Sequence, residues 1–167
     1  MLVWFQFYAV AAGASAALLG LLFVAVSMNA HAVLGAGHEN TRRLAEQAFQ
    51  NYLAVLLVSL LAVFPGMSIT DFAVATMCAT VAQTGWVLVR VYLALASDAE
   101  RGSRFYALRR HLTSLIGFGM VLGAGLDMVL TREDHRGWIG AAIMVLLLSA
   151  TTVSWELLVR LAKGEAV

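Results

Sequence analysis

The chain has 167 residues, of which 61% are hydrophobic and 13% are charged, and its mean hydropathy is +0.83. An ordinary soluble domain is roughly 45–50% apolar and about 25% charged, so the composition excludes a soluble domain and indicates an integral membrane protein. The net charge of +1 leaves no basic surface for nucleic acid, and a single cysteine, Cys78, excludes an internal disulfide and a cysteine-rich metal site.

The first predicted span covers residues 2–28. It belongs to a run, Met1 to Gly37, that contains no Asp, Glu, Lys or Arg. A chain of this size cannot cover such a run on all sides, whereas a bilayer needs only about 20 apolar residues per crossing. The run lacks a basic start and exceeds the apolar part of a signal peptide, so we expect it to remain in the mature protein.

Four further spans follow. Thr41 is a candidate cap for the second span, residues 45–64, which ends at Pro65 because proline disfavours helix in the residue before it. Ser68 and Asp71 have the spacing of a cap pair that opens the third span, residues 69–96. The last two spans are predicted at 112–130 and 138–161. The predicted fold is an all-α, polytopic membrane helix bundle, one transmembrane domain over residues 1–167.

Basic residues indicate the orientation of the bundle. If the N-terminus is outside, nine of the 11 Lys and Arg residues fall on the cytoplasmic side, and only Arg132 and Arg136 lie outside. Cytoplasmic loops carry the excess of Lys and Arg in membrane proteins. We therefore predict an outside N-terminus and a cytoplasmic C-terminus.

The third span carries polar residues at helical spacing on one side. They are Thr76, Thr80, Gln83, Thr84 and Arg90. Gln83 falls near the middle of the bilayer, where lipid cannot satisfy the hydrogen-bonding sites of its amide. This face either lines a hydrated pathway or forms hydrogen bonds within the bundle, and the second use is the commoner one in membrane proteins.

Small residues form stripes on the first and fourth spans. They are Gly13, Ala17 and Gly20 in the first span, with Ser15 and Ala16 beside them, and Gly117, Gly119, Gly123 and Gly125 in the fourth, of which Gly119 and Gly123 form a G-x-x-x-G pair. Small residues allow close approach of helix backbones in lipid. We expect helix contacts inside the bundle at these stripes, and a contact between subunits is the alternative.

The last two predicted spans contain three charged residues. Glu156 and Arg160 are four residues apart, which is the spacing of an ion pair along a helix. Asp127 stands at the outer end of the fourth span, where an ion pair with Arg132 or Arg136 is expected and a cation site is the alternative.

The sequence contains no motif for catalysis or for binding a cofactor. Its histidines are scattered, and the spacing of His31, His38 and Glu39 matches no common metal-ligand pattern. A nucleophile elbow, a phosphate-binding glycine loop and a zinc-protease motif are all missing from the sequence. We expect no catalytic, cofactor-binding or metal-binding residues, and we do not expect an enzyme.

Three segments of the sequence resemble a group of small bacterial five-span proteins. The segments are AAGASAALLGLLFVAVSMN in the first span, VLLVSLLAVFPG at the end of the second, and Trp155-Glu156-Leu157-Leu158 in the fifth. Some members of the group carry the label "modulator of FtsH protease". The resemblance implies a multi-pass protein of the bacterial inner membrane, and the label implies a membrane protease as a partner.

Two hypotheses for the function follow. The first is a homo-oligomer with channel-like or transport-like architecture, because one small bundle has too few helices to enclose a wide pathway alone. The second is a regulatory or structural membrane protein that transports nothing and binds another membrane protein. In both, the lipid bilayer is a partner, and nucleic acid is not.

The predicted orientation can be checked with reporter fusions. A reporter placed after Lys163 should be active only in the cytoplasm, and one inserted between Gly66 and Ser68 should be active only outside the membrane. The reverse pattern would contradict the orientation derived from the basic residues.

Overall fold

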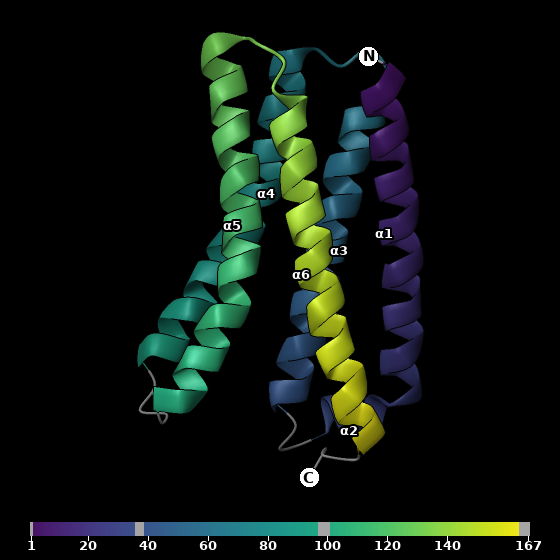
Figure 1. The fold of residues 1–167 in the computed structure, drawn as a ribbon, viewed down its shortest axis with the longest axis vertical. Coiled ribbons are helices and arrows are strands. Elements are labelled where there is room, and N and C mark those ends of the chain that lie inside the picture. Colours follow the sequence, from purple (N-terminus) through teal and green to yellow (C-terminus); the bar gives the residue numbers. More distant parts are fainter. Residues whose placement is uncertain (1, 36–38, 97–100, 164–167) are drawn as a thin grey trace.

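The computed structural model of the chain describes residues 2–35, 39–96 and 101–163 (Figure 1). Within these ranges the chain forms six helices: α1 (Leu2–Met28), α2 (Ala30–Leu34), α3 (Glu39–Val63), α4 (Ile69–Ala96), α5 (Arg101–Thr131) and α6 (Arg136–Lys163). Five of these, all except α2, are long and apolar enough to cross a membrane. The prediction of an all-helical fold with five candidate spans is confirmed, and the orientation stays a prediction.

The observed helices are longer than their apolar cores. α1 and α4 have the predicted bounds, but α3 begins at Glu39 and α5 at Arg101, well before their apolar runs. In α3 the early start is stabilised by ion pairs along the helix, Arg43 with Glu39 at 3.2 Å and Arg42 with Glu46 at 2.8 Å. Thr41 therefore lies inside α3, where it is buried, and its predicted capping role is wrong.

The turn between α3 and α4 follows its sequence closely. α3 ends at Val63, just before Pro65, and Gly66 adopts a φ of +76°, which side chains other than glycine rarely tolerate. The Ser68 Oγ accepts the backbone N–H of Asp71 at 3.1 Å and donates to its carboxylate at 2.6 Å. The predicted cap pair is confirmed, and it starts α4 antiparallel to α3 (Figure 1).

The helices have a definite lateral order. α3 and α6 pack together in the middle, α1 packs against α3, and α5 packs between α6 and α4. The start of α1, the α3–α4 turn and the α5–α6 turn lie at one end of the bundle, and α2 and the end of α6 lie at the other (Figure 1). Toward the α2 end, α4 and the start of α5 diverge from the other helices.

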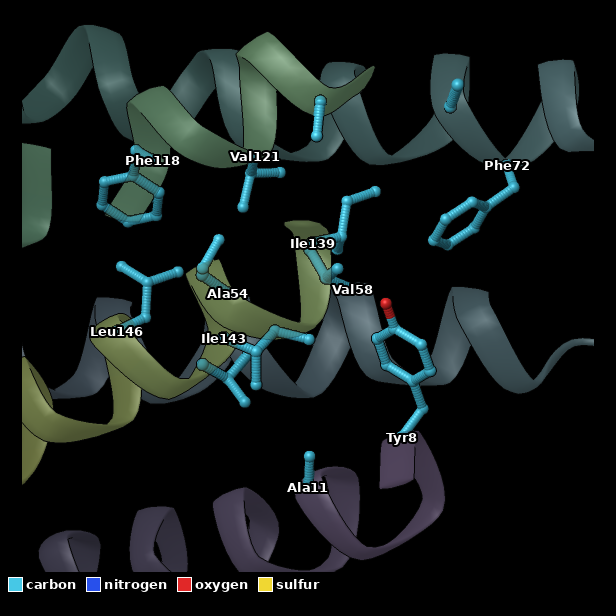
Figure 2. Packing of buried hydrophobic residues seen from close by; sticks show 14 of the residues in the cluster. Tyr8, Ala11, Ala54, Val58, Phe72, Phe118, Val121, Ile139, Ile143 and Leu146 are labelled. Carbon is cyan, nitrogen blue, oxygen red and sulfur yellow. The ribbon is translucent and has the colours of Figure 1, made fainter. Parts of the chain in front are cut away.

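A core of apolar side chains joins all five long helices in the half of the bundle near the α5–α6 turn. Figure 2 shows Phe118 and Val121 of α5 facing Leu146 and Ile143 of α6, with the Tyr8 ring of α1 below Phe72. A second cluster near α2 contains Leu22, Val33, Leu44, Tyr52, Val153 and Leu157. Large apolar side chains such as Phe23 and Leu148 are also exposed on the outside, as expected of helices that face lipid.

Only some of the predicted small residues pack inside the bundle. The inner face of α1 presents Ala11, Ala12 and Ser15, all buried. Gly13, Ala17 and Gly20 are exposed on the outside of α1, and so are Gly119 and Gly123 on α5. A Cβ added to any of these four glycines would meet no atom within 4 Å. The expected contact inside the bundle is wrong for the stripe on α1 and for the G-x-x-x-G pair on α5, and a contact between subunits stays a prediction at these positions.

The other two glycines of the predicted α5 stripe, Gly117 and Gly125, provide the expected close helix contacts. A Cβ at Gly117 would lie 2.7 Å from the Cγ of Leu146 in α6, and one at Gly125 would lie 2.7 Å from the Cγ of Met77 in α4. These distances are shorter than van der Waals contact, so both positions need glycine for the observed packing.

We therefore expect Gly117→Ala to destabilise the bundle by about 1–3 kcal/mol, because Leu146 is buried and its branch point must move. Gly119→Ala, two residues away on the outer face, is the matched control and should be neutral or stabilising by up to about 1 kcal/mol through helix propensity. The measurement is reversible unfolding of both variants in detergent. Equal stabilities would contradict the close α5–α6 contact.

Candidate functional site

Buried polar side chains from three helices meet close to the middle of the bundle. We call this set the polar cluster; it consists of Gln47 and Asn51 of α3, Thr113 and Ser114 of α5, and Ser149 of α6. Asn51 is central, since its Nδ2 donates to the Oγ of Ser114 at 2.9 Å and to the Oγ of Ser149 at 3.2 Å. The cluster thus connects α3 with both α5 and α6 through side-chain hydrogen bonds.

The remaining members complete the network. The Nε2 of Gln47 donates to the Oγ of Ser114 at 3.2 Å. The hydroxyls of Ser114 and Thr113 each lie 3.0 Å from the Oγ of Ser149. Gln47, Asn51, Ser114 and Ser149 are at most 5% exposed, and only Thr113, at the edge, is exposed. The cluster therefore consists of uncharged side chains that are joined to one another by hydrogen bonds.

A second set of hydrogen bonds joins α1 to this region through Tyr52. The Oγ of Ser15 donates to the backbone carbonyl of Tyr52 at 2.6 Å, which ties α1 to α3. The Tyr52 hydroxyl lies 3.4 Å from the hydroxyls of Thr151 and Ser154 in α6. Each contact uses a small polar residue where two helices approach closely, as is common in membrane bundles.

The polar face predicted for the third span is mostly covered by the chain itself. Thr76 and Thr80 of α4 are at most 2% exposed. The hydroxyls of Thr80 and Thr84 donate to the carbonyls of Thr76 and Thr80 in the same helix, at 2.6 and 2.9 Å. Thr76 and Thr80 therefore do not face outward onto an axis between subunits.

Gln83 is the exception on this face. It is half-buried, and its Oε1 has no hydrogen-bond partner among the described residues. In the described part of the bundle, the buried hydroxyls of Ser59 and Thr76 also have no hydrogen-bond partner. The side chain of Arg90, the last residue predicted for this face, lies outside the described residues.

The charged groups are paired at both ends of the bundle. Arg160 donates to Glu156 at 2.6 Å, so the predicted ion pair is confirmed. At the opposite end Asp127 does not pair with an arginine, because the α5–α6 turn places the Nδ1 of His135 3.1 Å from its carboxylate. The predicted ion pair of Asp127 with Arg132 or Arg136 is therefore wrong.

Arg136 instead forms part of a contact between the first and last helices, which the sequence did not indicate. The Tyr8 hydroxyl donates to the Arg136 carbonyl at 2.7 Å, and the Arg136 guanidinium lies 5.4 Å from the centre of the Phe72 ring. The Trp4 ring packs so close to Gly140 that an added Cβ would lie 3.2 Å from it. We call this set, Trp4, Tyr8, Phe72, Arg136 and Gly140, the turn-end clasp.

No group of three or more His, Cys, Asp or Glu side chains in the described part of the chain could hold a metal ion. Comparison of the chain with protein-family models, with curated proteins and with solved structures finds no match. The assignment of a function therefore rests on the physical chemistry of the bundle.

The polar cluster leaves a signal in the sequence that is visible once the structure is known. Gln47 and Asn51 are four residues apart in α3, so both lie on one face of the helix. Ser114 and Ser149 have no distinctive spacing, and serines are frequent in membrane helices. Their involvement could not be found without the helix packing.

The two amides at membrane depth should respond differently to the same substitution. Asn51→Leu removes the two hydrogen bonds that the Asn51 amide donates to Ser114 and Ser149, so we expect a loss of about 0.6–2 kcal/mol in unfolding free energy. Gln83→Leu breaks no hydrogen bond of the Gln83 Oε1, so its stability should be unchanged or higher. Unfolding in detergent measures both, and equal losses would contradict the structural role of the polar cluster.

Proposed function

We propose that this chain is a multi-pass protein of the bacterial inner membrane that conducts nothing through its own bundle and acts by lateral association in the membrane. The observation that supports the proposal best is the polar cluster. Its Asn51, Ser114 and Ser149 side chains are buried and use their hydrogen bonds on one another. A conducting pathway needs polar groups that turn toward water, and these groups turn toward each other.

The outer surface favours lateral association as the mode of action. Gly119 and Gly123 leave a flat stripe on α5 that no helix of the same chain covers. The turns outside the membrane are short, since residues 64–68 join α3 to α4 and residues 132–135 join α5 to α6. Contacts with other proteins are therefore expected mainly along the lipid-facing helices, where small residues allow close packing.

The first candidate for the associated protein is a second copy of the chain. The glycine stripe is self-complementary in the way that G-x-x-x-G pairs are in helix dimers. The resemblance to proteins labelled as modulators of a membrane protease adds a second kind of partner, a larger membrane complex. In either case the chain is a regulatory or structural component, not an enzyme.

A transport-like oligomer is the second candidate, and Gln83 favours it. Its Oε1 is buried without a partner halfway along α4, and the residue is half-exposed at the surface of the bundle. A neighbouring subunit or water at an interface between copies would supply the missing hydrogen bond. In this arrangement a pathway would run between subunits and past Gln83.

One experiment separates the candidates. Purified protein is reconstituted in liposomes, ion flux is measured, and the native mass is determined in detergent. We expect an oligomer, no flux of common ions above empty liposomes, and a lower mass for Gly119→Leu than for Gly85→Leu. Gly85 is the matched control, because it too is exposed with no atom within 4 Å of an added Cβ.

Flux that Gln83→Leu abolishes would replace the proposed function with the transport-like candidate, because a leucine dries a narrow polar passage. An unchanged mass for Gly119→Leu would contradict self-association through the glycine stripe. A monomer that copurifies with one defined membrane complex would contradict self-association and would support lateral association with that complex.

A further inference from the structure

A pocket of about 240 Å³ opens on the side of the bundle between the end of α1, helix α2 and the start of α3. Its floor is formed by Leu22, Val33 and Ala45, which are buried. Phe23 of α1 and Phe49 of α3 also line the pocket, and both are exposed. The lining contributed by α1 and α2 is therefore apolar, and the pocket opens on the side of the bundle, where lipid is expected.

One edge of the pocket is polar and runs along α3. Arg42, Glu46 and Gln50 lie at intervals of four residues on the same face of the helix. At 1.5 Å per residue this edge is about 12 Å long, close to the half-thickness of about 15 Å of a bilayer core. Arg42 lies near the start of α3, so the pocket extends from the membrane surface into the hydrocarbon.

The mouth of the pocket presents both signs of charge. The Nε of Arg42 donates to the Oε1 of Glu46 at 2.8 Å, and both side chains are partly exposed. One turn of helix nearer the start of α3, Arg43 and Glu39 form a second exposed pair at 3.2 Å. Among the described residues, the mouth thus carries a guanidinium and a carboxylate group side by side, with the second pair close by on α3.

From this geometry we infer that the pocket binds one zwitterionic phospholipid, with an acyl chain between Leu22, Phe23 and Val33 and the headgroup at Arg42 and Glu46. A guanidinium binds phosphate with further N–H groups than the one that Arg42 donates to Glu46. A carboxylate accepts several hydrogen bonds, so Glu46 can receive a primary ammonium as well as Arg42. A phosphoethanolamine headgroup offers both of these groups at the required proximity.

The alternative occupants fit the mouth less well. An anionic headgroup without an amine would bring a second negative charge beside the Glu46 carboxylate and no ammonium group to offset it. A helix of another protein would have to leave the bilayer to pack along α2, whereas the headgroup and acyl chain of a lipid already lie at this depth. The inference goes beyond the proposed function and does not depend on it, because a bound lipid is compatible with a conducting or a silent bundle.

The test is lipid binding by the full chain in detergent, followed by native mass spectrometry during titration with phosphatidylethanolamine or phosphatidylglycerol of identical acyl chains. We expect one retained phosphatidylethanolamine per chain and several-fold weaker retention of phosphatidylglycerol. Val26→Phe fills the pocket from α1 and should weaken retention about tenfold, as loss of most of the buried chain surface predicts. Val24→Phe, on the exposed side of α1, is the matched control and should bind as the wild type does.

The mouth is tested separately with Glu46→Gln, which leaves Arg42 without its charged partner. This variant should lose the preference for phosphatidylethanolamine and retain phosphatidylglycerol at least as well. Ala45→Phe fills the pocket from α3 and replaces Val26→Phe if that variant does not fold.

Two results would overturn the inference: equal retention by the Val26→Phe and Val24→Phe variants, or equal retention of the two lipids by the wild-type protein. Neither result would alter the expected absence of flux or the expected mass of the oligomer, so a failure here is distinct from a failure of the proposed function.

Discussion

Lipid offers no hydrogen bond to the Asn51 amide, and the packing of three helices depends on that constraint. α3, α5 and α6 lie at distances that allow Asn51 to reach Ser114 and Ser149 together, at 2.9 and 3.2 Å. An unsatisfied amide in hydrocarbon costs several kcal/mol, so arrangements in which these helices separate or rotate are disfavoured by that one residue. The apolar core then has a fixed register in which to pack, including the close contact of Gly117 with Leu146.

α4 is held by different forces from those that hold the other spans. The hydroxyls of Thr80 and Thr84 bond to carbonyls of the same helix, so they form no hydrogen bond to α3 or α5. α4 stays in place through apolar packing and the close approach of Met77 to Gly125, together with Phe72 under the guanidinium of Arg136. This difference accounts for the shape in Figure 1, in which α4 and the start of α5 diverge from the other helices toward the α2 end.

The number and order of the spans could be read from the sequence because hydropathy and turn residues act locally. Pro65, Gly66 and Ser68 define a turn without help from distant residues, and the predicted Ser68–Asp71 pair is present. Which face of a helix turns inward is not a local property. Gly13 and Gly119 look like packing positions in isolation, but Ser15 and Gly117 occupy the inner faces because they meet Tyr52 and Leu146. The polar cluster was missed for the same reason, since its partners are distant along the chain.

The turn-end clasp has a consequence for how the protein is made. The Tyr8 hydroxyl and the carbonyl that it contacts are 128 positions apart in the chain. At a synthesis rate of roughly 5–20 residues per second, α1 waits in the bilayer for roughly 6–25 seconds before its partner on α6 emerges. The Ser15 contact with Tyr52 forms much earlier, so α1 and α3 pair first while the other end of α1 stays open. The contact of α6 with the Trp4 ring of α1 is thus among the last to form as the bundle assembles.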